Sequence, residues 1–86
     1  MVDDIRFFLY GRDTCPFCSH AEDYFIATGR EYYYHNYVDE PDEIEHCKEF
    51  YGHPTVPIIV ANNKKTGESL FIGGYTDLME YIEKND

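Results

Sequence analysis

A chain of 86 residues suits one domain with one core, because a chain of this length buries only about 60–65% of its unfolded surface. An apolar share of 43%, including 17% aromatic residues, excludes a disordered chain. The 17 acidic residues against 7 basic ones give a net charge of −10, which repels phosphate and argues against nucleic acid or an anionic membrane as a partner. The charge serves solubility, or it steers the chain toward a basic patch on a protein partner.

The cysteine count and the N-terminal residues point to a reducing compartment. Three cysteines are too few, and odd in number, for a disulfide scaffold. Residues 1–4 lead directly into an apolar run, without the basic segment and cleavage site of a secretory leader. No stretch approaches the roughly 20 apolar residues of a membrane span. We expect a cytoplasmic protein that acts as a monomer and has no membrane partner.

The first half of the chain predicts a strand, a helix and a second strand. Residues 5–10 form a short apolar run, rich in aromatic and β-branched side chains, that ends at Gly11 and is typical of a buried strand. From residue 16, apolar side chains recur with helical spacing until Gly29, a typical helix stop. Residues 32–38 are rich in strand-forming side chains. A strand there would run parallel to the first, because a helix joins the two.

A second helix is predicted next. Proline and acidic residues at positions 39–43 are typical of a helix start, and Gly52 is a typical stop. The side chains expected on its inner face are Ile44, Cys47 and Tyr51, with Phe50 as a further candidate.

The last third of the chain predicts a hairpin and a third helix. Residues 58–61 are a clear strand, and residues 69–72 return as its partner before a glycine pair. Asp77, with Glu80 three residues later, resembles a capping box and predicts that the last helix begins at Asp77. The order strand, helix, strand, helix, strand, strand, helix contains a βαβ unit and indicates an α/β fold.

The segment between the first strand and the first helix places two thiols three residues apart. If Cys15 is the N-cap, Pro16 occupies the first helical position, where its missing N–H costs nothing. Cys18 then lies one turn further on, within disulfide reach. The unpaired N–H groups and the dipole of the helix start favour a thiolate at Cys15, which we predict to be the nucleophile.

Three motifs occur in order along the chain: Cys-Pro-Phe-Cys at residues 15–18, Thr-Val-Pro at residues 55–57, and Gly-Gly-Tyr-Thr-Asp at residues 73–77. Together they resemble those of the small dithiol glutaredoxins of bacteria and their phages. The resemblance spans nearly the whole chain. It implies one thioredoxin-like domain over residues 1–86, with a four-stranded mixed sheet, three helices and a cis peptide bond before Pro57. It also implies no bound cofactor or metal, with glutathione as a co-substrate.

The resemblance also implies roles for individual residues. Cys15 would attack a disulfide and Cys18 would resolve the product. Thr55 and Val56 would hold a glutathionyl or peptide cysteine beside Cys15, and the start of the last helix would bind the γ-glutamyl group. The implied binding residues are Arg12, Phe17, Thr55, Val56, Pro57, Gly74, Thr76 and Asp77.

Three positions depart from the family pattern. Arg12 stands where lysine is usual, and Phe17 stands where tyrosine is usual. Pro54 stands where many members have a cation for the glycyl carboxylate of glutathione. Because of Pro54, an alternative function remains open: a thioredoxin-like electron donor that is recharged by a flavoprotein reductase instead of glutathione.

Other interpretations of the remaining residues are weaker. Cys47, with His46 or His53, could nominally complete a zinc or iron–sulfur site, but the chain has no second CxxC pair. Cys47 is better explained as a small buried apolar residue than as a regulatory thiol. His20 is expected on the solvent side of the first helix, and no histidine is needed as a base. The tyrosines at residues 32–34 are better explained by strand packing than by partner binding.

The predicted function is therefore a dithiol oxidoreductase that reduces protein and glutathione mixed disulfides. Ribonucleotide reductase is a client implied by the resemblance alone. The alternatives from other classes are a metal or iron–sulfur binding module and an interaction domain that uses the acidic and tyrosine-rich surfaces.

Overall fold

A computed structural model describes residues 4–12, 14–37, 39–53 and 55–85. The elements follow the predicted order. They are β1 (Ile5–Gly11), α1 (Pro16–Thr28), β2 (Tyr32–Asn36), α2 (Pro41–Tyr51), β3 (Ile58–Asn63), β4 (Ser69–Gly73) and α3 (Tyr75–Asn85).

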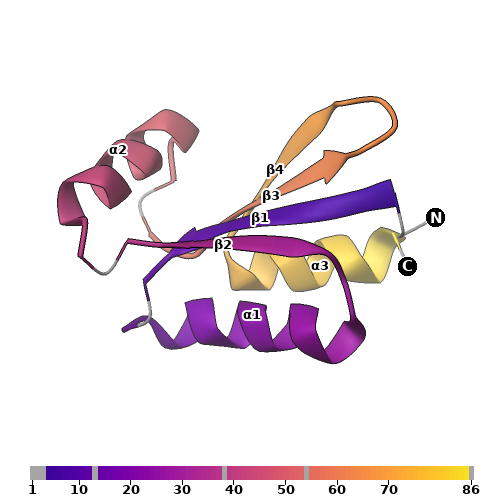
Figure 1. Ribbon diagram of the computed structural model, residues 1–86, viewed down its shortest axis with the longest axis horizontal. Helices are drawn as coiled ribbons and strands as arrows, with labels where there is room; N and C mark the ends of the chain where they lie inside the picture. Colours follow the sequence, from indigo (N-terminus) through magenta and orange to yellow (C-terminus); the bar gives the residue numbers. More distant parts are fainter. Residues whose placement is uncertain (1–3, 13, 38, 54, 86) are drawn as a thin grey trace.

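The strands form one mixed sheet in the order β2-β1-β3-β4. β1 and β2 are parallel, as a helical crossover requires, whereas β3 is antiparallel to both β1 and β4. Figure 1 shows α1 and α3 packed side by side on one face of this sheet, and α2 beyond the other face at the end where β1 finishes. The thioredoxin-like fold predicted from the sequence is confirmed.

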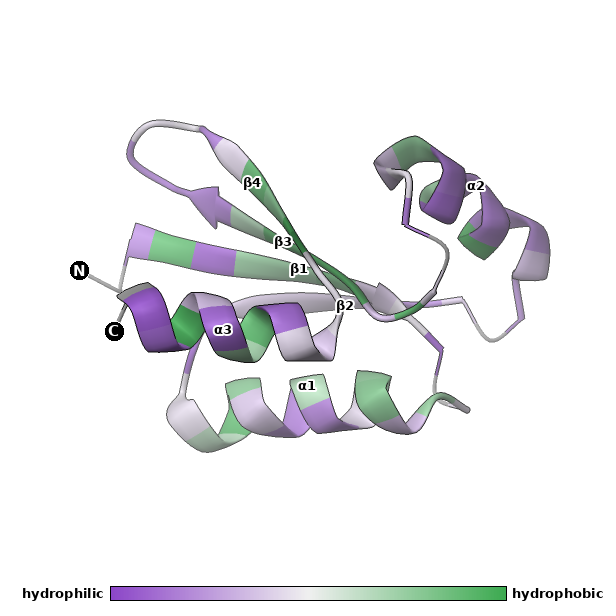
Figure 2. Cartoon of the chain, turned by 180° about the vertical axis from the view of Figure 1, so that it is seen from behind, coloured by the Kyte–Doolittle hydropathy of each residue, from purple (hydrophilic) through white to green (hydrophobic). Residues whose placement is uncertain are grey.

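The core lies between the sheet and the pair formed by α1 and α3. Alternate residues of β1, Phe7 and Leu9, point into it and are fully buried. The ring of Phe25 on α1 stacks on Phe7 with centroids 4.8 Å apart, and Leu78 of α3 is fully buried beside them. Figure 2 shows the apolar first part of β3, residues 58–61, all of which are buried, and its hydrophilic end. The two helices are therefore held on the sheet mainly by apolar burial.

The end of the sheet where β1 begins is tied by polar contacts. The β3–β4 turn carries Lys64, whose Nζ lies 2.6 Å from a carboxylate oxygen of Glu31, and Lys65, whose Nζ lies 3.4 Å from Asp4. The side chain of Asn62 accepts a hydrogen bond from Arg6 at 2.8 Å. These contacts explain why β3 continues beyond the predicted residue 61, since its last residues pair with the start of β1.

Two expectations at the other end of the sheet need correction. The predicted strand over residues 32–38 ends at Asn36, because β1 ends at its partner Gly11; Val38 lies outside the described residues. On α2, Ile44 is buried as expected, and Cys47 and Tyr51 are partly buried. Phe50 is 80% exposed, so its expected place on the inner face is wrong.

The third helix begins earlier than predicted. Its first residue is Tyr75, and the carbonyl of Gly74 accepts the first helical hydrogen bond from the N–H of Leu78 at 2.9 Å. The Asp77 carboxylate reaches back and accepts the N–H of Gly74 at 3.0 Å. Asp77 therefore takes the third-position role of a capping box, with Gly74 as the N-cap, and the prediction that Asp77 begins the helix is wrong.

The capping contact predicts a stability difference between two acidic residues. Asp77→Ala removes the acceptor of the Gly74 N–H and a negative charge from the helix start, so the free energy of unfolding should fall by about 1 kcal/mol. Glu80→Ala, the matched control, should change it by less than about 0.5 kcal/mol. Urea denaturation followed by circular dichroism measures both. Equal losses for the two variants would contradict this account of the helix start.

Candidate active site

The first thiol of the pair lies at the start of α1, as predicted. Cys15 is the N-cap residue, with an extended backbone, and Pro16 follows at the first helical position. The Cys15 carbonyl accepts hydrogen bonds from the N–H groups of Cys18 at 3.1 Å and Ser19 at 3.3 Å. The Cys15 side chain is partly exposed, so a disulfide substrate can reach its sulfur.

The second thiol is in the protein interior. Cys18 is completely buried, and both cysteines are free thiols. Burial raises the pKa of the Cys18 thiol to about 12, and a hydrogen bond shared with Cys15 contributes in the same direction. A hydrogen bond from the Arg12 backbone N–H and the Arg12 charge lower the pKa by less than burial raises it. Two thiols one helical turn apart therefore have very different environments.

A cis peptide bond lies opposite the thiols. The bond between Val56 and Pro57 is cis, as the resemblance implied. The Cys15 Sγ lies 3.6 Å from the carbonyl oxygen of Val56, within range of a weak hydrogen bond. The loop before β3 therefore brings a backbone carbonyl directly to the first thiol.

A groove of about 220 Å³ begins at this loop and reaches the start of α3. It brings together most of the binding residues predicted from the sequence. Arg12 is the exception, because it does not line the groove; its partly buried side chain has an Nε without a hydrogen-bond partner in the described part of the chain. The lining residues are Phe17, His53, Thr55, Val56, Pro57, Gly74, Tyr75, Thr76 and Asp77.

Two of the lining residues were missed by sequence reasoning. The Nδ1 of His53 donates to the carbonyl of Thr55 at 2.8 Å, which holds the ring at the wall of the groove. Tyr75 stacks on Phe17 with centroids 6.1 Å apart, and the exposed ring of His20 contacts both edge-on. In the sequence, Tyr75 stands within the Gly-Gly-Tyr-Thr-Asp motif, and His53 lies two residues before Thr-Val-Pro. Pro54 lies outside the described residues.

Gly11 was expected only to end the first strand, but it also packs against the buried thiol. A Cβ built on Gly11 would overlap the Cys18 Sγ, closer than real Cβ atoms approach another atom. It would also lie 3.2 Å from the Cys18 Cβ and 3.9 Å from the Pro57 Cα. The absence of a side chain at residue 11 therefore provides the space that the Cys18 sulfur occupies.

The third cysteine lies in a separate place. Cys47 lines a cavity of about 330 Å³ on α2, next to Tyr10, Tyr37 and Tyr51, and burial raises the pKa of its thiol. Among the described residues, no group of three or more histidine, cysteine or acidic side chains could hold a metal ion. In the same part of the chain, no helix is long and apolar enough to cross a membrane.

The tyrosines at residues 32–34 alternate between the two faces of β2, as strand geometry requires. Tyr32 and Tyr34 pack against the core, whereas Tyr33 is 51% exposed and stacks on Phe8. Strand packing thus accounts for two of the three.

Comparisons with solved structures agree with this architecture. A wheat glutaredoxin superposes with a TM-score of 0.72 at 22% identity, over 93% of this chain and 74% of that one. Glutaredoxin 1 from Francisella tularensis, solved with cacodylate, gives 0.62 at 20% identity, over 93% and 94%. The dithiolic glutaredoxin 2-C-Grx1 of Trypanosoma brucei brucei gives 0.70 at 25% identity, over 99% and 84%. These likenesses support the fold, and the last of these proteins is a dithiolic glutaredoxin.

A comparison with curated protein sequences found no match. The family model for glutaredoxin matches residues 7–65, which include both thiols and the cis peptide bond. The chain therefore belongs to the glutaredoxin family, whose members are thiol-disulfide oxidoreductases.

Proposed function

We propose that the protein reduces glutathione and protein mixed disulfides, with Cys15 as the nucleophile, Cys18 as the resolving thiol and glutathione as the co-substrate. The observation that carries this proposal is the groove. It extends from the Val56 carbonyl, which contacts the Cys15 sulfur, to the start of α3. A short peptide with a central sulfur and a terminal carboxylate suits such a groove.

The first step is thiol-disulfide exchange at Cys15. Its thiolate attacks one sulfur of the mixed disulfide, a new S–S bond forms at Cys15, and the other sulfur leaves as a thiolate. The helix start supports the negative charge on Cys15, because the first-turn N–H groups have no helical partner. No metal or prosthetic group is needed for this step.

The groove would orient the glutathionyl part of the substrate. The backbone of Val56 precedes the cis proline and can pair with an extended peptide, while Thr55 and Phe17 flank it. The first-turn N–H groups of α3, at Thr76 and its neighbours, are suited to a carboxylate. Asp77, already held by Gly74, would receive the substrate amine. Arg12, which does not line the groove, would add positive charge near the thiols.

The second step has two routes. In the monothiol route, a glutathione thiolate attacks the Cys15 mixed disulfide and releases oxidised glutathione. In the dithiol route, Cys18 attacks the Cys15 sulfur and the client leaves. Since Cys18 is a weak acid, its proton passes to the departing sulfur as the Cys15–Cys18 disulfide forms. The two electrons gained by the client come from the two protein thiols.

The proposal extends to the setting of the protein. We place it as a single glutaredoxin-like domain, monomeric and in a reducing compartment such as the cytoplasm, since free thiols carry its chemistry. Ribonucleotide reductase is a candidate client of the dithiol route, and formation of deoxyribonucleotide in a reconstituted assay would test it.

Serine substitutions separate the two routes. Cys15→Ser should reduce turnover of a small glutathione mixed disulfide to the uncatalysed background, because the attacking sulfur is lost. Cys18→Ser should keep that turnover within about threefold of wild type while losing reduction of protein disulfides. Coupled glutathione reductase assays measure the first activity, and insulin reduction the second. Wild-type activity in Cys15→Ser would remove the proposed nucleophile.

The physiological reductant can be identified by measuring reduction of a client disulfide with two different systems that regenerate the reduced protein. Glutathione with glutathione reductase should support faster turnover than a flavoprotein thioredoxin reductase, because the groove offers sites for both ends of the γ-glutamyl group. The comparison uses one client disulfide and equal protein concentrations. Faster turnover with the flavoprotein reductase would assign the protein to thioredoxin-like donors.

The buried thiol should titrate at high pH. In a Cys15→Ser, Cys47→Ser variant, the ultraviolet absorbance of the Cys18 thiolate should develop well above pH 9, toward a pKa of about 12. It is measured as the difference from the same variant with Cys18→Ala, which cancels the absorbance of the ionising tyrosines. The contribution of Cys18 to the free energy of unfolding should be constant below pH 9 and fall as pH rises toward 12, because the unfolded chain loses its thiol proton first. Replacing Cys18 with alanine should make the alkaline fall smaller, and burial of Tyr37 and Tyr51, which raises the pKa of both phenols, accounts for part of the remaining fall. A Cys18 titration near the ordinary value of 9.0 would contradict the burial effect.

A further inference from the structure

Gly11, the last residue of β1, lies where there is no room for a side chain. Four described glycines have positive φ, but Gly11 is not one of them, so its backbone conformation is open to any residue. Its hypothetical Cβ, in contrast, falls on the Cys18 sulfur. The next residue, Arg12, directs its backbone N–H to the same sulfur. Backbone atoms of Gly11 and Arg12 therefore lie close to the Cys18 side chain.

The sulfur has little freedom to move elsewhere. Cys18, Ala21 and Phe25 form the buried stripe of α1, and that stripe fixes the helix on β1. Figure 1 shows the end of β1 above the start of α1. A methyl group at residue 11 would therefore force the Cys18 sulfur to rotate, because neither backbone can withdraw without losing core packing.

We propose that Gly11 is a positioning residue that seats the Cys18 sulfur for attack on Cys15, and thereby sets how readily the protein uses its dithiol route. The inference rests on the proposed function, because it assigns Cys18 as the resolving thiol. Disulfide formation requires narrow limits on the Cβ–S–S–Cβ dihedral and the S–S distance, so a displaced sulfur resolves slowly. The monothiol route does not involve the Cys18 sulfur and should be insensitive to residue 11.

A double-mutant cycle tests whether Gly11 positions the Cys18 sulfur. Its four proteins are wild type, Gly11→Ala, Cys18→Ala and Gly11→Ala/Cys18→Ala. The first measurement is the rate of Cys15–Cys18 disulfide formation after Cys15 is loaded with hydroxyethyl disulfide, by acid quench and mass spectrometry. Gly11→Ala should slow it by tenfold or more. The second is turnover of a small glutathione mixed disulfide by the two Cys18→Ala proteins, which should agree within twofold.

Thermal unfolding of all four proteins guards against a simple loss of fold. If Gly11→Ala fails to fold but Gly11→Ala/Cys18→Ala folds, the steric conflict lies at the Cys18 sulfur. That result would also support the positioning role of Gly11. An unchanged rate of disulfide formation in Gly11→Ala would overturn the proposal, as would loss of fold or monothiol turnover in the double variant. If Cys18→Ala itself has no turnover, the monothiol route is rejected. The rates of disulfide formation in wild type and Gly11→Ala would still test the positioning role of Gly11.

Discussion

The packing of one helical stripe against one strand governs both the core and the chemistry. Cys18, Ala21 and Phe25 recur on the face of α1 that lies on β1, and the Phe25 ring stacks on Phe7. Because the stripe begins at Cys18, the same contact that anchors the helix buries one thiol and leaves Cys15, a turn earlier, at the rim. The helix cannot shift along the strand without exposing apolar rings, so the relation of the two sulfurs is fixed by the core.

The difference in burial gives the thiols of Cys15 and Cys18 different roles in the proposed mechanism, although the two groups are chemically identical. Cys15 lies at an open helix start beside a backbone carbonyl, where a substrate can arrive. Cys18 is held protonated by its surroundings, and its high pKa keeps it from competing as a nucleophile. In the proposed dithiol route, Cys18 is needed only after a mixed disulfide has formed at Cys15. The order of events in the proposed dithiol route thus follows from where each thiol sits.

Much of this arrangement was predictable, because strand and helix patterns and the CxxC spacing are local signals. The start of α1 at Cys15 and the cis bond before Pro57 were expected and are present. The start of α3 was not, since Asp77 fits two positions of a capping box equally well in sequence and only its contact with Gly74 decides. The close approach of Gly11 to Cys18 and the place of His53 depend on contacts between β1 and α1 and around the groove, which no local pattern encodes.

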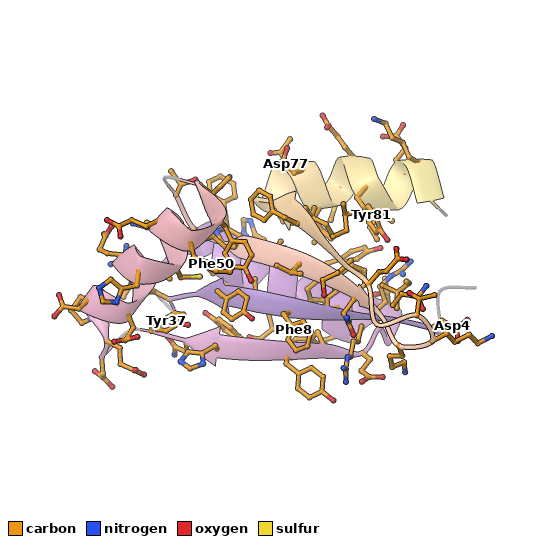
Figure 3. All side chains as sticks on the ribbon, turned by 90° about the horizontal axis from the view of Figure 1, so that it is seen from above. Asp4, Phe8, Tyr37, Phe50, Asp77 and Tyr81 are labelled. Carbon is orange, nitrogen blue, oxygen red and sulfur yellow. The ribbon has the colours of Figure 1, made fainter. Side chains whose placement is uncertain are left out.

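The ion pairs at the β3–β4 turn bear on how the molecule meets other proteins. Lys64 and Lys65, each paired with one acidic residue, lie beside the start of β1, far from the thiols. At the opposite end, α2 carries four acidic residues against one lysine, Lys48; the acidic residues are Asp42, Glu43, Glu45 and Glu49. Figure 3 shows this separation, with Asp4 at one end and Phe50 and Tyr37 at the other. The negative charge of the chain is therefore unevenly distributed, with an excess on α2. A cationic surface would attract the end that carries α2 before contact, and added salt would weaken that attraction.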